Sequence, residues 1–348
     1  MHHLLLIGCG NMARHGHLPQ LLELENLKLA VCCDSVLEKA ESIQQEFGFI
    51  RASEDYRREL ECKDLDLVLV ATTWQPRFQI IKDCLLAGKH VLAEKPLTLF
   101  PGEIDELMEI SRRTGSKLRV GYIQRASAMM THVRQMIRDG AIGVPKSLSI
   151  VHHQRGCRED WPVLRNLLRG GVTPGIDCGI HICDVARWWF DCEPDSVFSF
   201  GCRLDDIDSA TLTHDCFTMK NGVKVSIEEC YSNNTNPYVR IQLLGDRGGI
   251  VPVWGRGGQH DHIIHWNGVD YVENKIEFPT GGKATGNQMR NFLTEIERNA
   301  DLIPHLLDVR KSTEMALGGL LASARGERVN FPLPPADIAA CQTLITRD

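Results

Sequence analysis

The 348-residue chain has no apolar run that approaches the roughly 20 residues needed by a membrane-spanning helix. Its first residues do not form a basic segment followed by an apolar stretch and a cleavage site, so we expect no secretory signal and a cytoplasmic location. The net charge of −6 gives no broad positive surface, which argues against nucleic acid and anionic membranes as partners. The sequence therefore predicts a soluble intracellular protein.

No Cys-x-x-Cys pair occurs among the 13 cysteines, although such pairs commonly supply structural zinc with two thiolates. Several cysteines, such as Cys32 and Cys33, lie in apolar stretches where a thiol acts as a small buried group. The segment His260–His265 contains three histidines that can be drawn as a metal site, but alternating histidines on an exposed strand or loop are the commoner explanation. We predict reduced cysteines and no metal.

The chain is longer than a single hydrophobic core comfortably allows, so two domains with a cleft between them are expected. From Met1 to Val120, short apolar runs alternate with longer amphipathic ones, a pattern typical of a parallel sheet covered by helices. The predicted strands are His3–Ile7, Leu27–Cys33, Leu65–Ala71, His90–Ala93 and Lys117–Val120, and the predicted helices are Asn11–Leu24, Val36–Phe47, Arg77–Ala87 and Pro101–Thr114.

After Gly121 the pattern changes to closely spaced strands separated by turn residues, which predicts an α+β domain with a large, mostly antiparallel open sheet. The predicted strands are Ser147–His153, Ser196–Leu204, Thr211–Thr218, Val223–Cys230 and Val239–Leu244, and the predicted helices are Met129–Arg138, Ile180–Phe190, Gln288–Asn299 and Val309–Ala324. We place the domains at residues 1–121 and 122–348, with the C-terminal segment able to pack back toward the first domain.

A glycine-rich turn follows the first predicted strand and opens the first predicted helix. Gly8 allows the tight turn, Gly10 lets the backbone approach a pyrophosphate, and Ala13 permits close packing of helix on strand. Backbone N–H groups of the helix's first turn, including those of Asn11 and Met12, would face the phosphates. A similar turn joins strand to helix in many α/β proteins, but the strand, turn, helix and second strand together favour a Rossmann domain, a doubly wound parallel sheet that binds a dinucleotide.

The second predicted strand ends at Asp34, about 24 residues after Gly10. A carboxylate at this position can accept hydrogen bonds from the adenosine ribose hydroxyls and would repel a 2′-phosphate, so the sequence favours NAD. Ser35 and Lys39 lie beside Asp34 and leave NADP open.

Glu94-Lys95-Pro96 follows the predicted strand His90–Ala93, at the carboxyl edge of the sheet where doubly wound folds bind ligands. Proline lowers the cost of a cis peptide, which would turn the lysine side chain toward the cleft. An isolated lysine at the end of a strand is more often a solvated surface group.

Asp177, His181 and Asp184 recur at spacings of four and three, so one helical face can present two carboxylates and an imidazole. Charged groups among apolar neighbours are costly unless they are paired or functional, and an imidazole exchanges a proton near neutral pH. A buried structural histidine is the alternative for His181.

Gly8-x-Gly10-x-x-Ala13, Glu94-Lys95-Pro96 and Asp177-x-Gly179-x-His181-x-x-Asp184, in this order, resemble the Gfo/Idh/MocA family over nearly the whole chain. The resemblance implies a Rossmann domain joined to an open-sheet α+β domain. It also implies reversible oxidation of a secondary alcohol on a sugar or inositol, with hydride passing to nicotinamide, and it assigns catalytic roles to Lys95, Asp177 and His181.

Hydride removal from a carbinol requires a base for the hydroxyl proton and positive potential on the oxygen that becomes a carbonyl. We expect His181 to exchange the proton and Lys95 to polarise the oxygen, while Asp177 fixes Lys95 or a neighbouring substrate hydroxyl. The reverse assignment of the base stays open.

Further contacts are expected from residues near these motifs. The expected cofactor contacts also include Ala71, Thr72, Thr73, Trp74, Glu94, Lys95, Pro96 and Gln124. The expected contacts to a polyhydroxylated substrate are Lys95, Tyr122, Arg125, His153, Trp161, Asp177 and His181. Arg125 can equally serve in a surface salt bridge, and we expect Glu228-Glu229 to be a solvated strand end. Trp74 and Phe78 depart from the family pattern, which leaves the contacts on the nicotinamide side open.

Two other functions are compatible with the sequence. One is a dinucleotide-binding sensor or regulatory protein of the same fold, although it would not need the set of Lys95, Asp177 and His181. The other is a reductase of a non-sugar substrate, which fold alone does not exclude. An open sheet face commonly needs to be covered, so we expect a homodimer or homotetramer.

Overall fold

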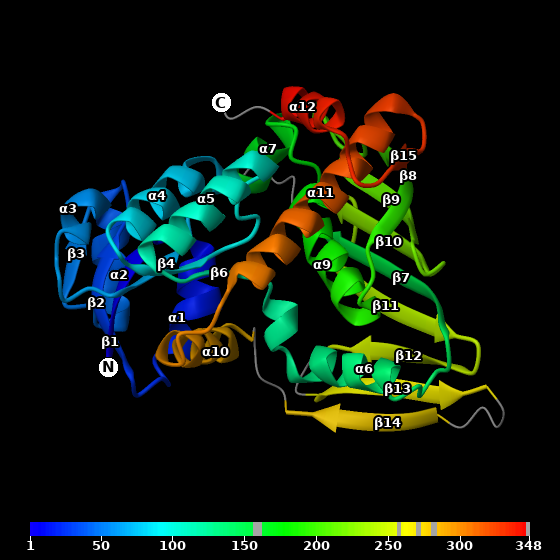
Figure 1. The fold of residues 1–348 in the computed structure, drawn as a ribbon, viewed down its shortest axis with the longest axis horizontal. Helices are drawn as coiled ribbons and strands as arrows, with labels where there is room; N and C mark the ends of the chain where they lie inside the picture. The colour runs from blue at the N-terminus through cyan, green and yellow to red at the C-terminus, as the bar shows by residue number, and fades with distance from the viewer. Residues whose placement is uncertain (156–161, 256–258, 269–272, 280–283, 346–348) are drawn as a thin grey trace. The chain divides into compact units, whose positions relative to one another are not determined.

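The structure is a computed structural model that describes residues 1–155, 162–255, 259–268, 273–279 and 284–345. The chain forms two compact units (Figure 1). Unit 1 contains residues 1–126 and 282–310, and unit 2 contains residues 127–281 and 311–348. The proposed domain boundary after residue 121 stays a prediction. Residues 282–310 belong to unit 1, although they lie far beyond this boundary in the sequence.

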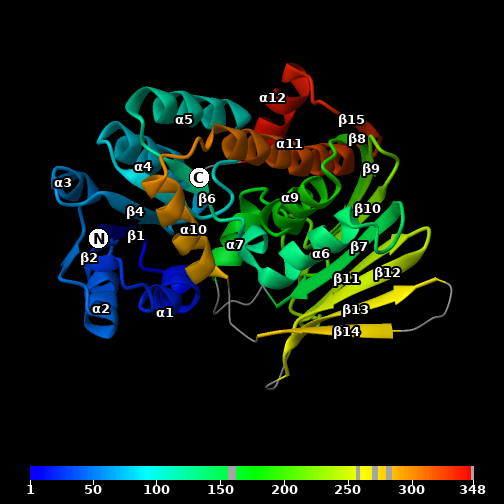
Figure 2. The same ribbon diagram turned by 60° about the horizontal axis from the view of Figure 1, so that its bottom comes forward.

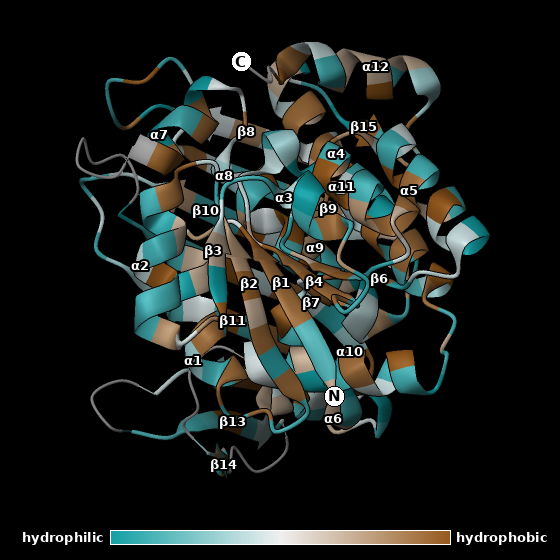
Figure 3. Cartoon of the chain, turned by 90° about the vertical axis from the view of Figure 1, so that its left-hand side faces the viewer, coloured by the Kyte–Doolittle hydropathy of each residue, from teal (hydrophilic) through white to brown (hydrophobic). Residues whose placement is uncertain are grey.

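Unit 1 contains a six-stranded parallel sheet in the order β3-β2-β1-β4-β5-β6. The strand order reverses between β1 and β4, which is the arrangement of a doubly wound dinucleotide-binding fold, so the predicted fold class is confirmed for this unit. Figure 3 shows hydrophobic residues along the central strands, as expected for strands that helices cover on both faces. The strands are β1 (His2–Ile7), β2 (Leu27–Cys33), β3 (Arg51–Ser53), β4 (Leu67–Val70), β5 (His90–Ala93) and β6 (Leu118–Val120).

Helices connect these strands. They are α2 (Leu37–Phe47), α3 (Tyr56–Leu60), α4 (Trp74–Leu86) and α5 (Pro101–Thr114), and a short 3₁₀ turn, η2 (Ile123–Ala126), follows β6. The helix predicted over Asn11–Leu24 is present over residues 11–21 but is not a regular α-helix, because the chain forms a π-helical segment, η1 (Met12–His17), and then a single α-helical turn, α1 (Leu18–Leu21). Pro19 has no N–H for the hydrogen-bond ladder, so a regular helix does not run through this segment.

A distant segment completes the core of unit 1. Helix α10 (Thr285–Glu297) and the beginning of α11 (Ile303–Arg325) belong to residues 282–310. Met289, Phe292 and Leu293 are buried in the same hydrophobic cluster as Leu4 and Leu6 of β1. The N-terminus of α10 is tied to η1, because the Thr285 hydroxyl donates to the Gly16 carbonyl at 2.6 Å. The sequence pattern predicts the helix but not its place in the first unit.

Unit 2 contains a nine-stranded sheet in the order β14-β13-β12-β11-β7-β10-β9-β8-β15. Only the pair β7 and β10 is parallel among the strand pairs that the described ranges contain, so the predicted, mostly antiparallel sheet is confirmed. The strands are β7 (Pro145–Gln154), β8 (Pro194–Cys202), β9 (Leu212–Met219), β10 (Lys224–Tyr231), β11 (Tyr238–Gly245), β12 (Gly248–Val253), β13 (Asp261–Asn267), β14 (Glu273–Phe278) and β15 (Val329–Asn330).

The helices of unit 2 are α6 (Ala128–Arg138), α7 (Pro162–Arg169), α8 (Pro174–Asp177), α9 (Gly179–Phe190) and α12 (Pro335–Leu344), together with the later turns of α11. Helices α8 and α9 pack on the central strands β7, β9 and β10, and Figure 2 shows α9 against this sheet. This packing places the Asp177–His181 segment over the middle of the sheet. Within the described part of the chain, no helix has the length and apolar character needed to cross a membrane.

Candidate functional site

The glycine turn after β1 has two different steric requirements. Gly8 adopts φ +98°, and a Cβ atom there would lie 2.7 Å from the Thr72 backbone nitrogen and 2.8 Å from the Ala71 carbonyl carbon. A Cβ atom on Gly10 would meet nothing within 4 Å, and the residue is exposed together with Asn11. Ala13 is fully buried against the core. The turn is therefore closed against the protein at Gly8 and open at Gly10, as an approaching pyrophosphate requires.

Asp34, directly after β2, is hydrogen-bonded to the same turn. Its Oδ2 accepts from the Cys9 N–H at 2.9 Å, and its Oδ1 accepts from the Val36 N–H at 3.0 Å. Each carboxylate oxygen can accept more than one hydrogen bond, so these contacts orient the side chain and leave acceptor capacity for ribose hydroxyls. Ser35 beside it is exposed.

The Glu94-Lys95-Pro96 segment follows β5 at the carboxyl edge of the sheet, and the Lys95–Pro96 peptide is cis. Glu94 is buried, with Oε1 2.7 Å from Nε2 of His17 and Oε2 accepting from the Lys95 N–H at 3.1 Å. Burial alone would raise the pKa of Glu94, but the hydrogen bond and charge of His17, with the charges of Lys95 and Arg77, lower this pKa to about 2. Glu94 is therefore an ionised group that fixes the loop, while Lys95 is half-buried.

Arg77, which sequence reasoning missed, joins the two loops at this edge. Its buried guanidinium donates to the Glu94 carbonyl at 3.0 Å and also to the carbonyls of Pro96 and Thr72. It thereby holds the loop after β4 against the loop that carries Lys95. The signal was available, because Arg77 lies three residues from both Trp74 and Ile80 on the buried face of α4, where a charge requires partners.

The remaining predicted residues of unit 1 differ in accessibility. Thr73 is exposed, Ala71 and Thr72 are half-buried, and Trp74 is 4% exposed with its ring centroid 6.2 Å from that of Phe100. Gln124 is half-buried, whereas Tyr122 is 2% exposed. Arg125 forms an ion pair with Asp308 at 3.1 Å, which is the salt-bridge alternative considered for it.

In unit 2, Asp177 and His181 come from two short helices that meet at Cys178, and not from one continuous helix. Both side chains are half-buried on helices whose other residues are mostly buried. The Tyr231 hydroxyl, on the last residue of β10, donates to Asp177 Oδ2 at 2.7 Å. Asp184, three residues after His181 in α9, is 0% exposed and accepts from the Ser312 hydroxyl at 3.5 Å, so it is more deeply buried than His181.

Helix α8 lies close to strand β9 because Gly175 has no side chain. A Cβ atom on Gly175 would lie 2.8 Å from Thr213 Oγ1 and 2.9 Å from Asp215 Oδ2. Asp215 is buried below the helix and accepts a 2.5 Å hydrogen bond from the Ser199 hydroxyl. Burial raises the pKa of Asp215 from 3.8 to about 6, although the Ser199 hydrogen bond opposes the rise.

This raised pKa predicts a pH-dependent cost in stability. A carboxyl whose pKa is higher in the folded state stabilises the fold fully below its unfolded pKa, and this contribution is lost as the pH rises through about 6. We expect the Asp215→Asn variant to gain roughly 2 kcal/mol in free energy of unfolding, relative to the wild type, between pH 4.5 and 7.5. Denaturant titration at both pH values measures this difference. The exposed Asp208→Asn variant should show no such change, and an equal difference for Asp215→Asn at both pH values would contradict the prediction.

Two histidines of β7 are paired with two glutamates of β10. His153 Nε2 lies 2.7 Å from Glu228 Oε1, and His152 Nδ1 lies 2.8 Å from Glu229 Oε2. The expectation that Glu228-Glu229 is a solvated strand end is wrong for Glu229, which is 0% exposed. Strand alternation explains this, because Glu229 shares the inward face of β10 with Val225 and Ile227.

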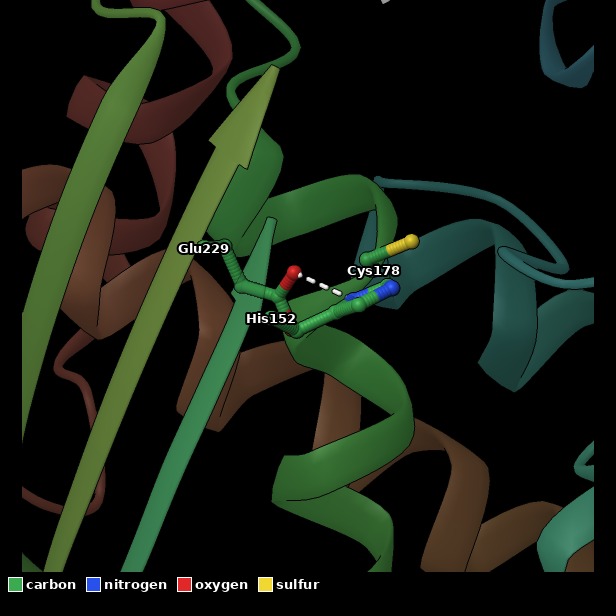
Figure 4. A group of neighbouring side chains, drawn as sticks. All are labelled: His152, Cys178 and Glu229. Carbon is green, nitrogen blue, oxygen red and sulfur yellow. Dashed lines mark hydrogen bonds and ion pairs between the residues drawn. The ribbon is translucent and has the colours of Figure 1, made fainter. Parts of the chain in front are cut away.

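His152 also contacts Cys178, and one ligand atom each from His152, Cys178 and Glu229 lie within 4.8 Å of one another (Figure 4). Burial lowers the pKa of His152, but hydrogen bonds to Cys178 and Glu229 outweigh it and raise this pKa to about 10. The predicted substrate contact Trp161 lies outside the described residues.

Comparison with known proteins identifies relatives over most of the chain. The family model described as "Oxidoreductase family, NAD-binding Rossmann fold" matches residues 2–122, and the "GFO/IDH/MocA C-terminal domain" matches residues 130–251. The scyllo-inositol 2-dehydrogenase (NAD(+)) of Bacillus subtilis is 27% identical over 258 residues, which cover 70% of this chain and 72% of that protein.

Solved structures share the fold. The aldose-aldose oxidoreductase from Caulobacter crescentus complexed with glycerol has a TM-score of 0.83 at 22% identity, covering 95% of this chain and 99% of that one. Levoglucosan dehydrogenase in complex with NADH and L-sorbose has a TM-score of 0.81 at 18% identity, covering 96% and 99%. The family matches agree with the observed strand order, and this chain belongs to the Gfo/Idh/MocA oxidoreductase family, with an NAD-binding Rossmann fold at its N-terminus.

Proposed function

We propose that this protein is a nicotinamide-dependent dehydrogenase or reductase that acts on a secondary alcohol or ketone of a sugar, a sugar derivative or an inositol. The family description supports the NAD-binding part of the proposal. The inositol dehydrogenase of Bacillus subtilis supports the substrate class, since that relative matches across both units of this chain.

The residues of unit 1 fit a dinucleotide. The open side of Gly10 would accept the pyrophosphate near Asn11 and Met12, and the Asp34 carboxylate would accept the ribose hydroxyls. Thr72, Thr73, Trp74, Glu94, Pro96 and Gln124 complete the proposed cofactor contacts. Asp34 favours NAD over NADP, because a carboxylate repels a 2′-phosphate. When bound, the nicotinamide supplies the hydride acceptor or donor.

Lys95, Asp177 and His181 are the proposed catalytic residues. The Lys95 ammonium places positive charge on the substrate oxygen that gains or loses carbonyl character. The His181 imidazole exchanges the hydroxyl proton, and Asp177, held by the Tyr231 hydroxyl, orients Lys95 or a second substrate hydroxyl. Tyr122, Arg125, His153 and Trp161 are proposed substrate contacts.

One observation favours catalysis over a non-catalytic sensor. Asp177 and His181 are half-buried titratable groups on helices that otherwise bury most of their side chains. Such groups are costly to place in an apolar setting, and dinucleotide binding alone does not need them. Assembly into a homodimer or homotetramer is part of the same proposal, supported by Phe198 and Phe200, which leave about half their surface exposed on one face of β8.

A substrate screen tests the proposal. The purified protein is incubated with inositols, polyols and free or nucleotide-linked sugars, each with NAD and with NADP, while the nicotinamide absorbance is followed. We expect turnover with at least one polyhydroxylated compound and a preference for NAD. Measurable NADH binding without turnover of any compound would favour the sensor instead.

A further inference from the structure

The inward faces of β7 and β10 carry a polar group that the proposed reaction does not use. His152 and Glu229 are paired in register between the two strands, and Cys178 approaches them from the junction of α8 and α9. Glu229 is fully buried, whereas His152 and Cys178 are half-buried. Figure 4 shows the His152 ring between the other two side chains, with one nitrogen bonded to the carboxylate and the other on the side of the sulfur.

Cys178, His152 and Glu229 thus have the arrangement of a nucleophile, its base and the group that orients the base, respectively. The buried Glu229 carboxylate holds His152 Nδ1 at 2.8 Å, so the second ring nitrogen is available to exchange a proton with the thiol. A bound metal would instead require the three side chains to surround a common point. The three ligand atoms do lie within 4.8 Å of one another, so the choice between a metal site and proton relay rests on the other contacts of the sulfur.

Further donors converge on the same sulfur. The Gln154 side-chain amide donates to Cys178 Sγ at 3.1 Å, and the Tyr231 hydroxyl lies 2.9 Å from it. With the His152 ring, these groups surround the sulfur with polar N–H and O–H groups. The single Tyr231 proton is shared between two acceptors, Cys178 Sγ and Asp177 Oδ2.

We propose that Cys178 is a nucleophilic thiol, activated by His152 and Glu229, whose reaction partners are small hydroperoxides and other soft electrophiles. With hydrogen peroxide, the sulfur attacks one oxygen, an S–O bond forms and the O–O bond breaks. The departing hydroxide takes the proton from His152 and becomes water, so the sulfur is oxidised by two electrons to a sulfenic acid and the peroxide is reduced. This inference concerns thiol chemistry and does not depend on the proposed dehydrogenase activity.

The test measures the reactivity of individual cysteines in the folded full-length chain. Limiting iodoacetamide is added at pH 7, and peptide mass spectrometry follows the alkylation of each cysteine. Cys192 is the control of similar exposure, and Cys202 is the more exposed control. We expect Cys178 to react at least about tenfold faster than both. Hydrogen peroxide followed by dimedone should likewise label Cys178 first, and dithiothreitol added before dimedone should prevent this labelling.

Variants separate activation from simple accessibility. His152→Gln should lower the alkylation rate of Cys178 about tenfold or more, because the proton acceptor is lost. Glu229→Gln should lower it less, and circular dichroism shows whether this buried substitution leaves the fold intact. His214→Gln is the matched control, because this histidine of the same sheet bonds Ser226 and should leave the rate unchanged.

Three results would overturn the proposal. The first is slower alkylation of Cys178 than of Cys202 in the wild type, and the second is an unchanged Cys178 rate in folded His152→Gln. The third is one equivalent of zinc per purified chain that is lost in His152→Gln, because the sulfur would then be a metal ligand and not a nucleophile. None of these readouts involves NAD or a sugar, so failure here is distinguishable from failure of the proposed function.

Discussion

Replacing Lys95 or His181 by alanine is expected to lower turnover by roughly 10²-fold or more in each case, with whichever substrate the screen identifies. Lys95→Ala removes the positive charge proposed to act on the reacting oxygen, and His181→Ala removes the proposed proton carrier. Steady-state kinetics at saturating NAD measure the effect. Only the rate of the chemical step should fall. The affinity of both variants for NADH, measured by NADH fluorescence, should therefore stay close to that of the wild type.

Matched substitutions guard against a general loss of structure. Lys82→Met removes a lysine that forms a surface ion pair with Glu106, and His214→Gln removes a histidine bonded to Ser226. Both should retain wild-type turnover. Wild-type rates in Lys95→Ala and His181→Ala together would remove these residues from the catalytic set and leave the family assignment standing.

Alanine at Gly8 and at Gly10 should have opposite consequences, although the two residues are two positions apart. Gly8→Ala places a methyl group 2.7 Å from a backbone nitrogen at φ +98°, so either β1 or the loop after β4 must move. We expect the free energy of unfolding to fall by about 2–4 kcal/mol. Gly10→Ala meets no protein atom within 4 Å, so stability should stay within about 1 kcal/mol of the wild type.

Gly10→Ala, which should keep its stability, should instead lose affinity for NADH. The methyl group of Gly10→Ala occupies space proposed for the pyrophosphate, so the Kd for NADH should rise at least about tenfold, which corresponds to ~1.4 kcal/mol. Denaturant titration and calorimetric binding of NADH to the two variants measure the pair of effects. A destabilised Gly10→Ala protein, or one that binds NADH normally, would contradict the proposed position of the dinucleotide.

The sequence predicts the architecture well where the signal is local and repeated. Continuous apolar strands indicated the parallel sheet, and the glycine turn with Asp34 indicated a Rossmann domain. The three-residue strand Arg51–Ser53 is too short for periodicity to mark it. The assignment of α10 to unit 1 depends on packing against residues far from it in sequence.

Sequence motifs identified the proposed catalytic residues. Residues that act through partners far away in the sequence were missed. Lys95, Asp177 and His181 lie in motifs, but Arg77 and His17 act through contacts with the loop around Glu94 that only the fold brings together. His152 and Glu229 could have been found by strict alternation, because Leu148, Ile150 and His152 share one face of β7, as Val225, Ile227 and Glu229 share one face of β10. Treating Glu228-Glu229 as one solvated pair overlooked that neighbours on a strand face opposite sides.

The return of residues 282–310 to the first unit also affects how the chain matures during translation. A ribosome that has synthesised residues 1–126 has made all six parallel strands. It has not yet made Met289, Phe292 and Leu293 of α10, which complete the hydrophobic core of this sheet. The nascent dinucleotide fold must therefore wait, with apolar surface still exposed, until more than 150 further residues have been added. Chaperone contact during synthesis is expected to concentrate on this interval.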